Sequence, residues 1–203
     1  MDERKENRVS KDYNKLDFSA INYIFTYDPS QRYTYKKVSN EILRVFKQYP
    51  EEDTDYHRSL FSRFYNILSK YVLVPLNMMC VPYVICKAPS HDPDAKDTSI
   101  DMMVIKAKQE FLPHFFEDGR HLLKRVIKME KSSTSNEKRS IDKQYESIEV
   151  SDPSKIRNKR VLLLDDIYTS GATIGACEKR LLEAGAKEVI IFTFARTREV
   201  IWR

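Results

Sequence analysis

Apolar residues occur in short runs along the chain, and two of these runs lie near its C-terminal end. Residues 161–164 and 187–194 form largely continuous apolar runs, which is typical of strands buried on both faces of a parallel sheet. Between them, residues 173–184 carry apolar side chains at helical spacing and charged side chains on the opposite face. Gly185 follows at the C′ position of this helix. The pattern therefore predicts a strand–helix–strand unit.

Segments farther upstream show similar patterns. The apolar run at 81–86 predicts another strand, and residues 100–116 predict a helix that covers the sheet. The spacing also predicts a strand at 21–27 and helices at 35–48 and 56–71. The chain thus combines strands and helices along its whole length.

Composition is that of an ordinary globular protein. The chain has 203 residues, of which 41% are hydrophobic and 32% charged, and this length allows one domain with a full core. No apolar run approaches the ~20 residues that a membrane-spanning helix needs. The N-terminus lacks the apolar segment of a secretory signal. We therefore expect a cytoplasmic protein without a membrane partner.

The cysteines and histidines show no metal-ligand spacing. Cys80, Cys86 and Cys177 form no C-x-x-C pair, so neither a zinc ribbon nor a disulfide framework is indicated. We expect each cysteine to be a small buried apolar side chain. The four histidines contain no H-E-x-x-H pattern, and we expect His91 to lie at the surface.

Candidate chemistry begins where the strand at 161–164 ends. Asp165 and Asp166 follow at its carboxyl end, where open α/β sheets bind their ligands. Thr169, Ser170, Gly171, Ala172 and Thr173 then form a turn of small residues directly before a helix. Such a turn can direct several backbone N–H groups and the positive end of the helix dipole at one phosphate. Paired carboxylates beside a phosphate cradle indicate a ribose 5-phosphate.

Two other phosphate-binding motifs are excluded by the glycine positions. The chain has four glycines, at 119, 171, 175 and 185. Neither the Walker pattern Gly-x4-Gly-Lys-[Ser/Thr] nor the dinucleotide pattern Gly-x-Gly-x-x-Gly can be built from them.

Residues 161–173 resemble the phosphoribosyl-pyrophosphate (PRPP) binding motif of the type I phosphoribosyltransferases. The family pattern is a hydrophobic strand, two adjacent acids, two hydrophobic or aromatic positions and Thr-[Thr/Ser]-Gly-x-Thr, and every position is met. The resemblance implies an α/β fold of three layers, in which helices flank a mostly parallel central sheet. A small N-terminal hood or cap is part of that expectation.

The resemblance also implies roles for these residues. Asp165 and Asp166 would hold the ribose 2- and 3-hydroxyls and act in catalysis, and Thr169 to Thr173 would hold the 5-phosphate. The cofactor would be Mg²⁺, which is held largely through substrate oxygens. The two acids would therefore contact the metal indirectly, together with PRPP.

Ala88, Pro89 and Ser90 follow the predicted strand at 81–86. At this place the family has a loop that binds pyrophosphate through backbone amides, and proline with small neighbours suits a tight loop. A simple strand-to-helix turn is the alternative interpretation.

The composition changes between residues 119 and 147. Residues 131–139 are polar, charged and rich in turn formers, which indicates a long exposed segment. In the family a mobile loop closes over the substrate here, so we expect Lys128, Lys131 or Arg139 to reach the pyrophosphate. A short strand within 145–150 would end this loop.

The net charge of +5 is concentrated between Lys124 and Lys143. This basic run fits a loop that closes on pyrophosphate, a plain solvated loop or a nucleic-acid-binding segment. The sequence does not separate these alternatives, and nucleic-acid binding has only charge in its support.

The order of elements is most similar to the ComF-type (competence protein F) branch. Residues 23–27 and 42–47 occupy the places of its tyrosine-bearing strand and its Ile-x-x-Phe-Lys ending. The four-cysteine zinc module of many ComF-type proteins is absent. An acidic stretch at 92–97 replaces the Arg-Gly-Phe-Asn-like segment of the family, and negative charge is unfavourable beside a pyrophosphate.

We expect residues 1–75 to form the cap or hood and residues 76–203 to form the phosphoribosyltransferase-like core. The leading hypothesis is a Mg²⁺-dependent phosphoribosyltransferase, a pentosyl-type glycosyltransferase that uses PRPP and a nucleobase or other nitrogen acceptor. The alternative is a non-catalytic PRPP-binding regulatory or accessory protein of nucleic-acid metabolism. A homodimer is expected from the resemblance alone.

Overall fold

A computed structural model of the chain describes residues 6–8, 16–27, 36–48, 53–93, 96–111, 115–128 and 141–197. Its centre is a six-stranded sheet with the strand order β1-β2-β8-β7-β3-β4, in which every neighbouring pair is parallel. The strands of this sheet are β1 (Glu6–Arg8), β2 (Ile21–Tyr27), β3 (Tyr83–Lys87), β4 (Phe116–Asp118), β7 (Arg160–Tyr168) and β8 (Glu188–Thr197). A second, antiparallel pair consists of β5 (Leu123–Arg125) and β6 (Ile148–Val150).

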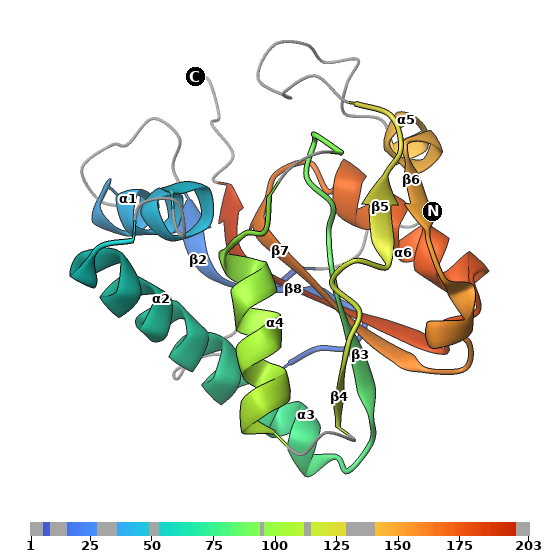
Figure 1. Cartoon of the computed structure of the whole chain (residues 1–203), viewed down its shortest axis with the longest axis horizontal. Helices are drawn as coiled ribbons and strands as arrows, with labels where there is room; N and C mark the ends of the chain where they lie inside the picture. The colour runs from blue at the N-terminus through green and yellow to red at the C-terminus, as the bar shows by residue number, and fades with distance from the viewer. Residues whose placement is uncertain are drawn as a thin grey trace.

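Helices cover both faces of the main sheet (Figure 1). The helical elements are α1 (Lys36–Leu43), η1 (Arg44–Gln48), α2 (Asp55–Leu68), η2 (Ser69–Leu73), α3 (Val74–Met78), α4 (Ser99–Glu110), α5 (Ile141–Glu146), η4 (Pro153–Lys155) and α6 (Ala172–Glu183). The mostly parallel sheet with flanking helices confirms the predicted fold class.

The central strands are buried on both faces because their side chains alternate between two cores. On β7, Leu162 and Leu164 face the core that includes residues of η1, α2 and α4, whereas Val161 and Leu163 face the core that includes residues of α6. All four side chains are completely buried, which explains why the sequence shows a continuous apolar run here.

The N-terminal helices and α4 share one core on the same face of the sheet. The Ser99 hydroxyl donates to the backbone oxygen of Val45, and the Tyr65 hydroxyl donates to Glu110 at 2.6 Å. These bonds link η1 and α2 to α4. The division of the chain at residue 75 stays a prediction.

The strand–helix–strand unit at the C-terminal end is confirmed. Helix α6 ends at Glu183, and its C-cap Ala184 is followed by a left-handed Gly185, whose φ is +95°. Its N–H donates to Leu182 at 3.0 Å, and the N–H of Ala186 donates to Leu181 at 3.0 Å. This pair of bonds is a Schellman motif, which satisfies two of the last helical carbonyls.

Strand β7 is longer than its apolar run predicts. It continues to Tyr168 because β8 runs beside it, with Asp165 paired to Thr193 and Tyr168 paired to Arg196. The two acids therefore lie on the paired end of a strand rather than in a turn.

The helix expected at 100–116 ends earlier, at Glu110. Phe111 has extended backbone (φ −99°, ψ 154°), and Phe116 begins β4, where it pairs with Tyr83. Pro113 lies two residues after Phe111 in the sequence, and a proline inside a helix would remove one of its backbone hydrogen bonds. Phe116 is 1% exposed, so apolar burial against β3 outweighs the helical periodicity.

Two of the three cysteines are buried, as expected. Cys86 and Cys177 are completely buried, whereas Cys80 is exposed, so the expectation for Cys80 was wrong. Cys80 has a positive φ of 54° in the turn between α3 and β3, and this turn places its side chain at the surface. Among the described residues, no helix is both long and apolar enough to cross a membrane.

Candidate functional site

A cavity of about 350 Å³ lies at the carboxyl ends of β3 and β7. The residues that line it are Tyr27, Phe46, Lys87, Ala88, Pro89, Ser90, His91, Thr98, Ile100, Arg125, Gln144, Asp165, Asp166, Ile167, Thr169 and Thr173. The cavity therefore brings the two acids, part of the small-residue turn and the loop at 88–90 to one place.

The two acids are fixed by backbone hydrogen bonds. The N–H of Asp166 donates to Oδ1 of Asp165 at 2.9 Å, and the N–H of Ile167 donates to Oδ1 of Asp166 at 2.7 Å. Both acids are half-buried in the cavity wall. The side chains are thus oriented before any ligand arrives.

The turn after β7 leads into the N-terminus of α6. Gly171 is the N-cap residue and has a φ of +76°, a backbone conformation that disfavours any residue with a Cβ. A Cβ at this position would also lie 2.8 Å from the Tyr168 ring. The first N–H groups of a helix have no partner within it, so the start of α6 offers donors to an anion. Thr169 and Thr173 line the cavity beside these groups.

The loop after β3 is hydrogen-bonded to β7. The N–H of Ala88 donates to the carbonyl oxygen of Leu164 at 2.9 Å, one residue before the paired acids. Ala88, Pro89 and Ser90 all line the cavity, and His91 beside them is exposed, as expected.

Arg125 belongs to the basic segment expected to form the loop and lines the cavity, although it was not among the predicted pyrophosphate-binding residues. Its side chain is 7% exposed. It donates to the Ser90 carbonyl oxygen at 2.9 Å, to Gln144 Oε1 at 2.8 Å and to Ser147 Oγ at 2.6 Å. Burial lowers the pKa of its guanidinium, and the nearby Cys177 thiol and Asp165 carboxylate act in the opposite direction.

Gln144 and Tyr145 connect the second half of segment 119–147 to α6. The Thr173 hydroxyl donates to Gln144 Oε1 at 3.4 Å, so one amide oxygen joins the phosphate turn to Arg125. The Arg180 guanidinium lies 3.7 Å from the centroid of the Tyr145 ring and donates to the Tyr145 carbonyl oxygen at 3.0 Å. In the described part of this segment, β5 and α5 thus pack beside the cavity. The expectation that the segment 119–147 is a mobile loop stays a prediction.

Lys87 is a second cation at the cavity. It is the last residue of β3, and its ammonium group pairs with the completely buried Asp101. The Thr98 N–H at 2.6 Å and the Thr98 hydroxyl at 2.9 Å donate to the same Asp101 oxygen. Lys87 directly precedes the predicted loop in the sequence, and this position was the signal that could have identified it.

The three basic residues predicted to reach the pyrophosphate are Lys128, Lys131 and Arg139, and only Lys128 lies among the described residues. Lys128 is 70% exposed and pairs with Asp92 at 2.8 Å, and it does not belong to the cavity lining. Lys131 and Arg139 lie outside the described residues. Asp92, whose charge counted against a pyrophosphate site, is thus balanced by a neighbouring lysine.

Comparison with known proteins agrees with this geometry. Residues 116–200 match the family model of the phosphoribosyl transferase domain. The matched residues include β7, the turn at 169–173 and α6, which carry the two acids and the small-residue turn. The fold and the match show that residues 116–200 are similar to a phosphoribosyl transferase domain, in agreement with the resemblance that the sequence indicated.

A competence protein gives a finer resemblance over a short stretch of the chain. The chain is 58% identical over 38 residues to competence protein ComFC of Streptococcus pneumoniae (strain ATCC BAA-255 / R6). This stretch covers 19% of the chain and 17% of the relative. Over this stretch the chain is similar to ComFC, in line with the ComF-type resemblance seen in the sequence, but it spans less than a fifth of that protein's length.

Proposed function

We propose that the chain binds PRPP and Mg²⁺ in the cavity at the ends of β3 and β7 and transfers the phosphoribosyl group to a nitrogen acceptor. The observation that carries this proposal is the convergence of the acid pair, the start of α6 and the loop at 88–90 on one cavity. The match of residues 116–200 to a phosphoribosyl transferase domain supports PRPP as the substrate.

The geometry supports one orientation of the substrate. The 5-phosphate would lie at the turn 169–173, of which Thr169 and Thr173 line the cavity and whose backbone N–H groups begin α6. The ribose hydroxyls would then meet Asp165 and Asp166, whose carboxylates are oriented by the bonds to Asp166 and Ile167 N–H. The pyrophosphate would extend toward Ala88, Pro89 and Ser90.

The acid pair also fits the proposed cofactor. Mg²⁺ prefers oxygen ligands and keeps several waters, so one or two carboxylates and substrate oxygens are a sufficient set. Asp165 and Asp166 would hold it together with PRPP. The bound ion would neutralise charge that develops on the leaving pyrophosphate.

Two protein cations face the same developing charge. Lys87 lines the cavity and ends the strand before the loop. Arg125 is buried in the cavity wall, and it keeps its charge there because a guanidinium does not deprotonate in proteins. Charges held in a poorly solvated wall act on a transition state more strongly than charges in water.

The reaction would break the bond between ribose C1 and the pyrophosphate oxygen and form a bond from C1 to the acceptor nitrogen. The nitrogen would lose its proton to solvent. Tyr27, Phe46 and Ile167 give the cavity an apolar side that suits a planar nitrogen heterocycle. The chain's contribution is to position both reactants and to exclude water.

A non-catalytic PRPP-binding protein is the second candidate function. It is favoured by Lys128, which pairs with Asp92 instead of lining the cavity, and by the relative's description as a competence protein. Such a protein would use the same acids and the same turn without turnover. Release of pyrophosphate in the presence of nucleobases separates the two functions.

Calorimetric titration with PRPP and Mg²⁺ tests the site itself. We expect saturable binding by the unmutated chain and loss of binding in the Asp165→Asn/Asp166→Asn variant. The matched control is Asp53→Asn/Asp55→Asn, which removes two exposed acids outside the cavity and changes the net charge equally. Equal binding by both double variants would refute the assignment of the acids.

A further inference from the structure

A completely buried carboxylate oxygen lies without a partner beside the candidate site. Asp101 is 0% exposed, and among the described residues its Oδ1 has no hydrogen-bond partner. All three donors on this side chain, from Lys87 and from the N–H and hydroxyl of Thr98, bind the other oxygen. A buried carboxylate oxygen of this kind is costly unless a group from outside satisfies it.

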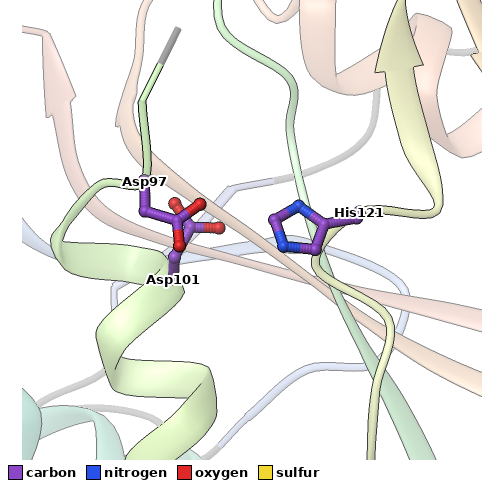
Figure 2. A group of neighbouring side chains, drawn as sticks. All are labelled: Asp97, Asp101 and His121. Atoms are coloured by element: carbon purple, nitrogen blue, oxygen red, sulfur yellow. The ribbon is translucent and has the colours of Figure 1, made fainter.

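Two further potential metal ligands lie close to this carboxylate. One ligand atom each from Asp97, Asp101 and His121 lie within 4.8 Å of one another. Figure 2 shows the His121 ring, which precedes β5, opposite the two carboxylates at the start of α4. Ligand atoms around a tetrahedral zinc ion lie about 3.3 Å apart, so the exposed side chains of Asp97 and His121 need only a small rotation to close the site.

We propose that Asp97, Asp101 and His121 bind one divalent transition-metal ion of the zinc type. The donor set of one imidazole nitrogen and two carboxylates favours such an ion over Mg²⁺ or Ca²⁺, which prefer oxygen ligands throughout. Three protein ligands leave at least one coordination position for water. The ion satisfies the orphaned oxygen of Asp101 and balances Asp97.

The neighbouring positive charges do not prevent the binding of a divalent ion. Lys87 binds only Oδ2 of Asp101, and Arg120 lies against Asp118, with its Nε 3.3 Å from that carboxylate. Two carboxylates, Lys87 and a divalent ion leave a net charge of +1, which is smaller than the charge of the free ion. Water ligands can carry the remainder of the coordination shell.

The site differs from the proposed Mg²⁺ site. Asp97, Asp101 and His121 do not line the cavity with Asp165 and Asp166, and the ion would bind without PRPP. His121 instead lines a second cavity of about 270 Å³ on the other side of the loop at Pro89 and Ser90. Binding here and PRPP binding can therefore fail independently.

Titration of the untagged, metal-free chain with Co²⁺ tests the proposal, because bound Co²⁺ has a visible absorption spectrum. We expect one equivalent per chain, displacement by Zn²⁺ and at least a tenfold loss of affinity in His121→Gln and in Asp97→Asn. Both residues are exposed, so these variants should fold. Asp55→Asn, an exposed acid of α2, is the matched control and should bind as the unmutated chain does.

A crystal grown with Zn²⁺ gives the second readout. An anomalous peak between the three side chains is the expected result. Unchanged Co²⁺ affinity in both variants, or a water molecule without anomalous signal on Asp101 Oδ1, would overturn the proposal.

Discussion

The guanidinium of Arg125 donates from Nε to the backbone carbonyl oxygen of Ser90 at 2.9 Å. This bond joins β5 to the loop after β3, across 35 residues of sequence. The other acceptors of Arg125, on Gln144 and Ser147, are also neutral oxygens. Three of the five N–H groups of the guanidinium thus have neutral acceptors, and its positive charge stays available to an anion in the cavity.

Replacing Arg125 by glutamine should weaken both the fold and the site. The variant leaves the buried oxygens on Ser90, Gln144 and Ser147 short of donors, which should cost about 2–3 kcal/mol of unfolding free energy. Pyrophosphate binding should fall at least tenfold, because the cavity loses a buried positive charge. Urea unfolding and calorimetry measure the two effects.

Lys124→Gln is the matched control for this change. Lys124 is the preceding residue of β5 and is exposed, so its loss should change stability by less than about 0.5 kcal/mol. If Arg125→Gln is no less stable than Lys124→Gln, the buried network does not support the fold.

Tyr145 should anchor α5 and thereby place Gln144. Its ring lies under the Arg180 guanidinium, and its hydroxyl donates to Glu183 at 2.5 Å. Tyr145→Ala should remove about 1–2 kcal/mol of stacking and apolar contact. We expect faster amide exchange across residues 141–147 and weaker PRPP binding, since Gln144 contacts Thr173.

Tyr145→Phe keeps the ring and removes only the hydroxyl. Because Glu183 is exposed, this variant should exchange almost as slowly as the unmutated chain. Equal exchange in Tyr145→Ala and the unmutated chain would show that α5 is held by other contacts.

The central part of the fold was readable from the sequence for a simple physical reason. Residues of β7 and β8 are buried on both faces of the sheet, so their apolar runs are continuous. A continuous apolar run can be recognised as a buried strand without resolving an alternating pattern. Gly185 was equally readable, because a left-handed C′ position favours glycine. The acids and the turn of the candidate site were found because they are contiguous with this strand.

The rest of the candidate site depends on contacts that no local pattern encodes. Arg125 lies in a stretch of basic residues, and only its three buried acceptors distinguish it from exposed Lys124. Asp101 and His121 are 20 residues apart and approach each other only because β4 pairs with β3. Phe116 was assigned to a helix because short apolar segments fit a strand and a helix equally well.

Stability should fall at alkaline pH because of the buried thiols. Burial raises the pKa of Cys86 from 9.0 to about 12. Above pH 9.0 the unfolded chain releases this proton while the folded chain keeps it, so the stabilisation is complete below that pH and is lost as the pH rises. Burial raises the pKa of Cys177 in the same direction.

Cys86→Ala should make the alkaline decline less steep, by up to about 1.4 kcal/mol per pH unit. Urea unfolding under reducing conditions between about pH 8 and about pH 10.5 measures the slope. Cys80→Ala is the control, because Cys80 is exposed. A slope that is equal in the two variants would exclude Cys86 as a source of the decline.

Two glycines should respond to alanine in opposite directions. A Cβ on Gly119 would lie 2.5 Å from Val84 Cγ1, 2.9 Å from Cys86 Sγ and 3.1 Å from the Ile85 carbonyl oxygen, all on buried β3. Gly119→Ala must push β4 and β3 apart and should cost roughly 1–3 kcal/mol of unfolding free energy.

Gly175 lies inside α6, and the nearest atom to its added Cβ would be Ile141 Cδ1 at 3.4 Å. Gly175→Ala removes backbone freedom from the unfolded chain without a severe contact, so it should stabilise the chain by about 0.5–1 kcal/mol. Urea unfolding midpoints of the two variants and the unmutated chain show whether each change raises or lowers the free energy of unfolding. A Gly119→Ala variant as stable as the unmutated chain would mean that the end of β4 does not approach β3 this closely.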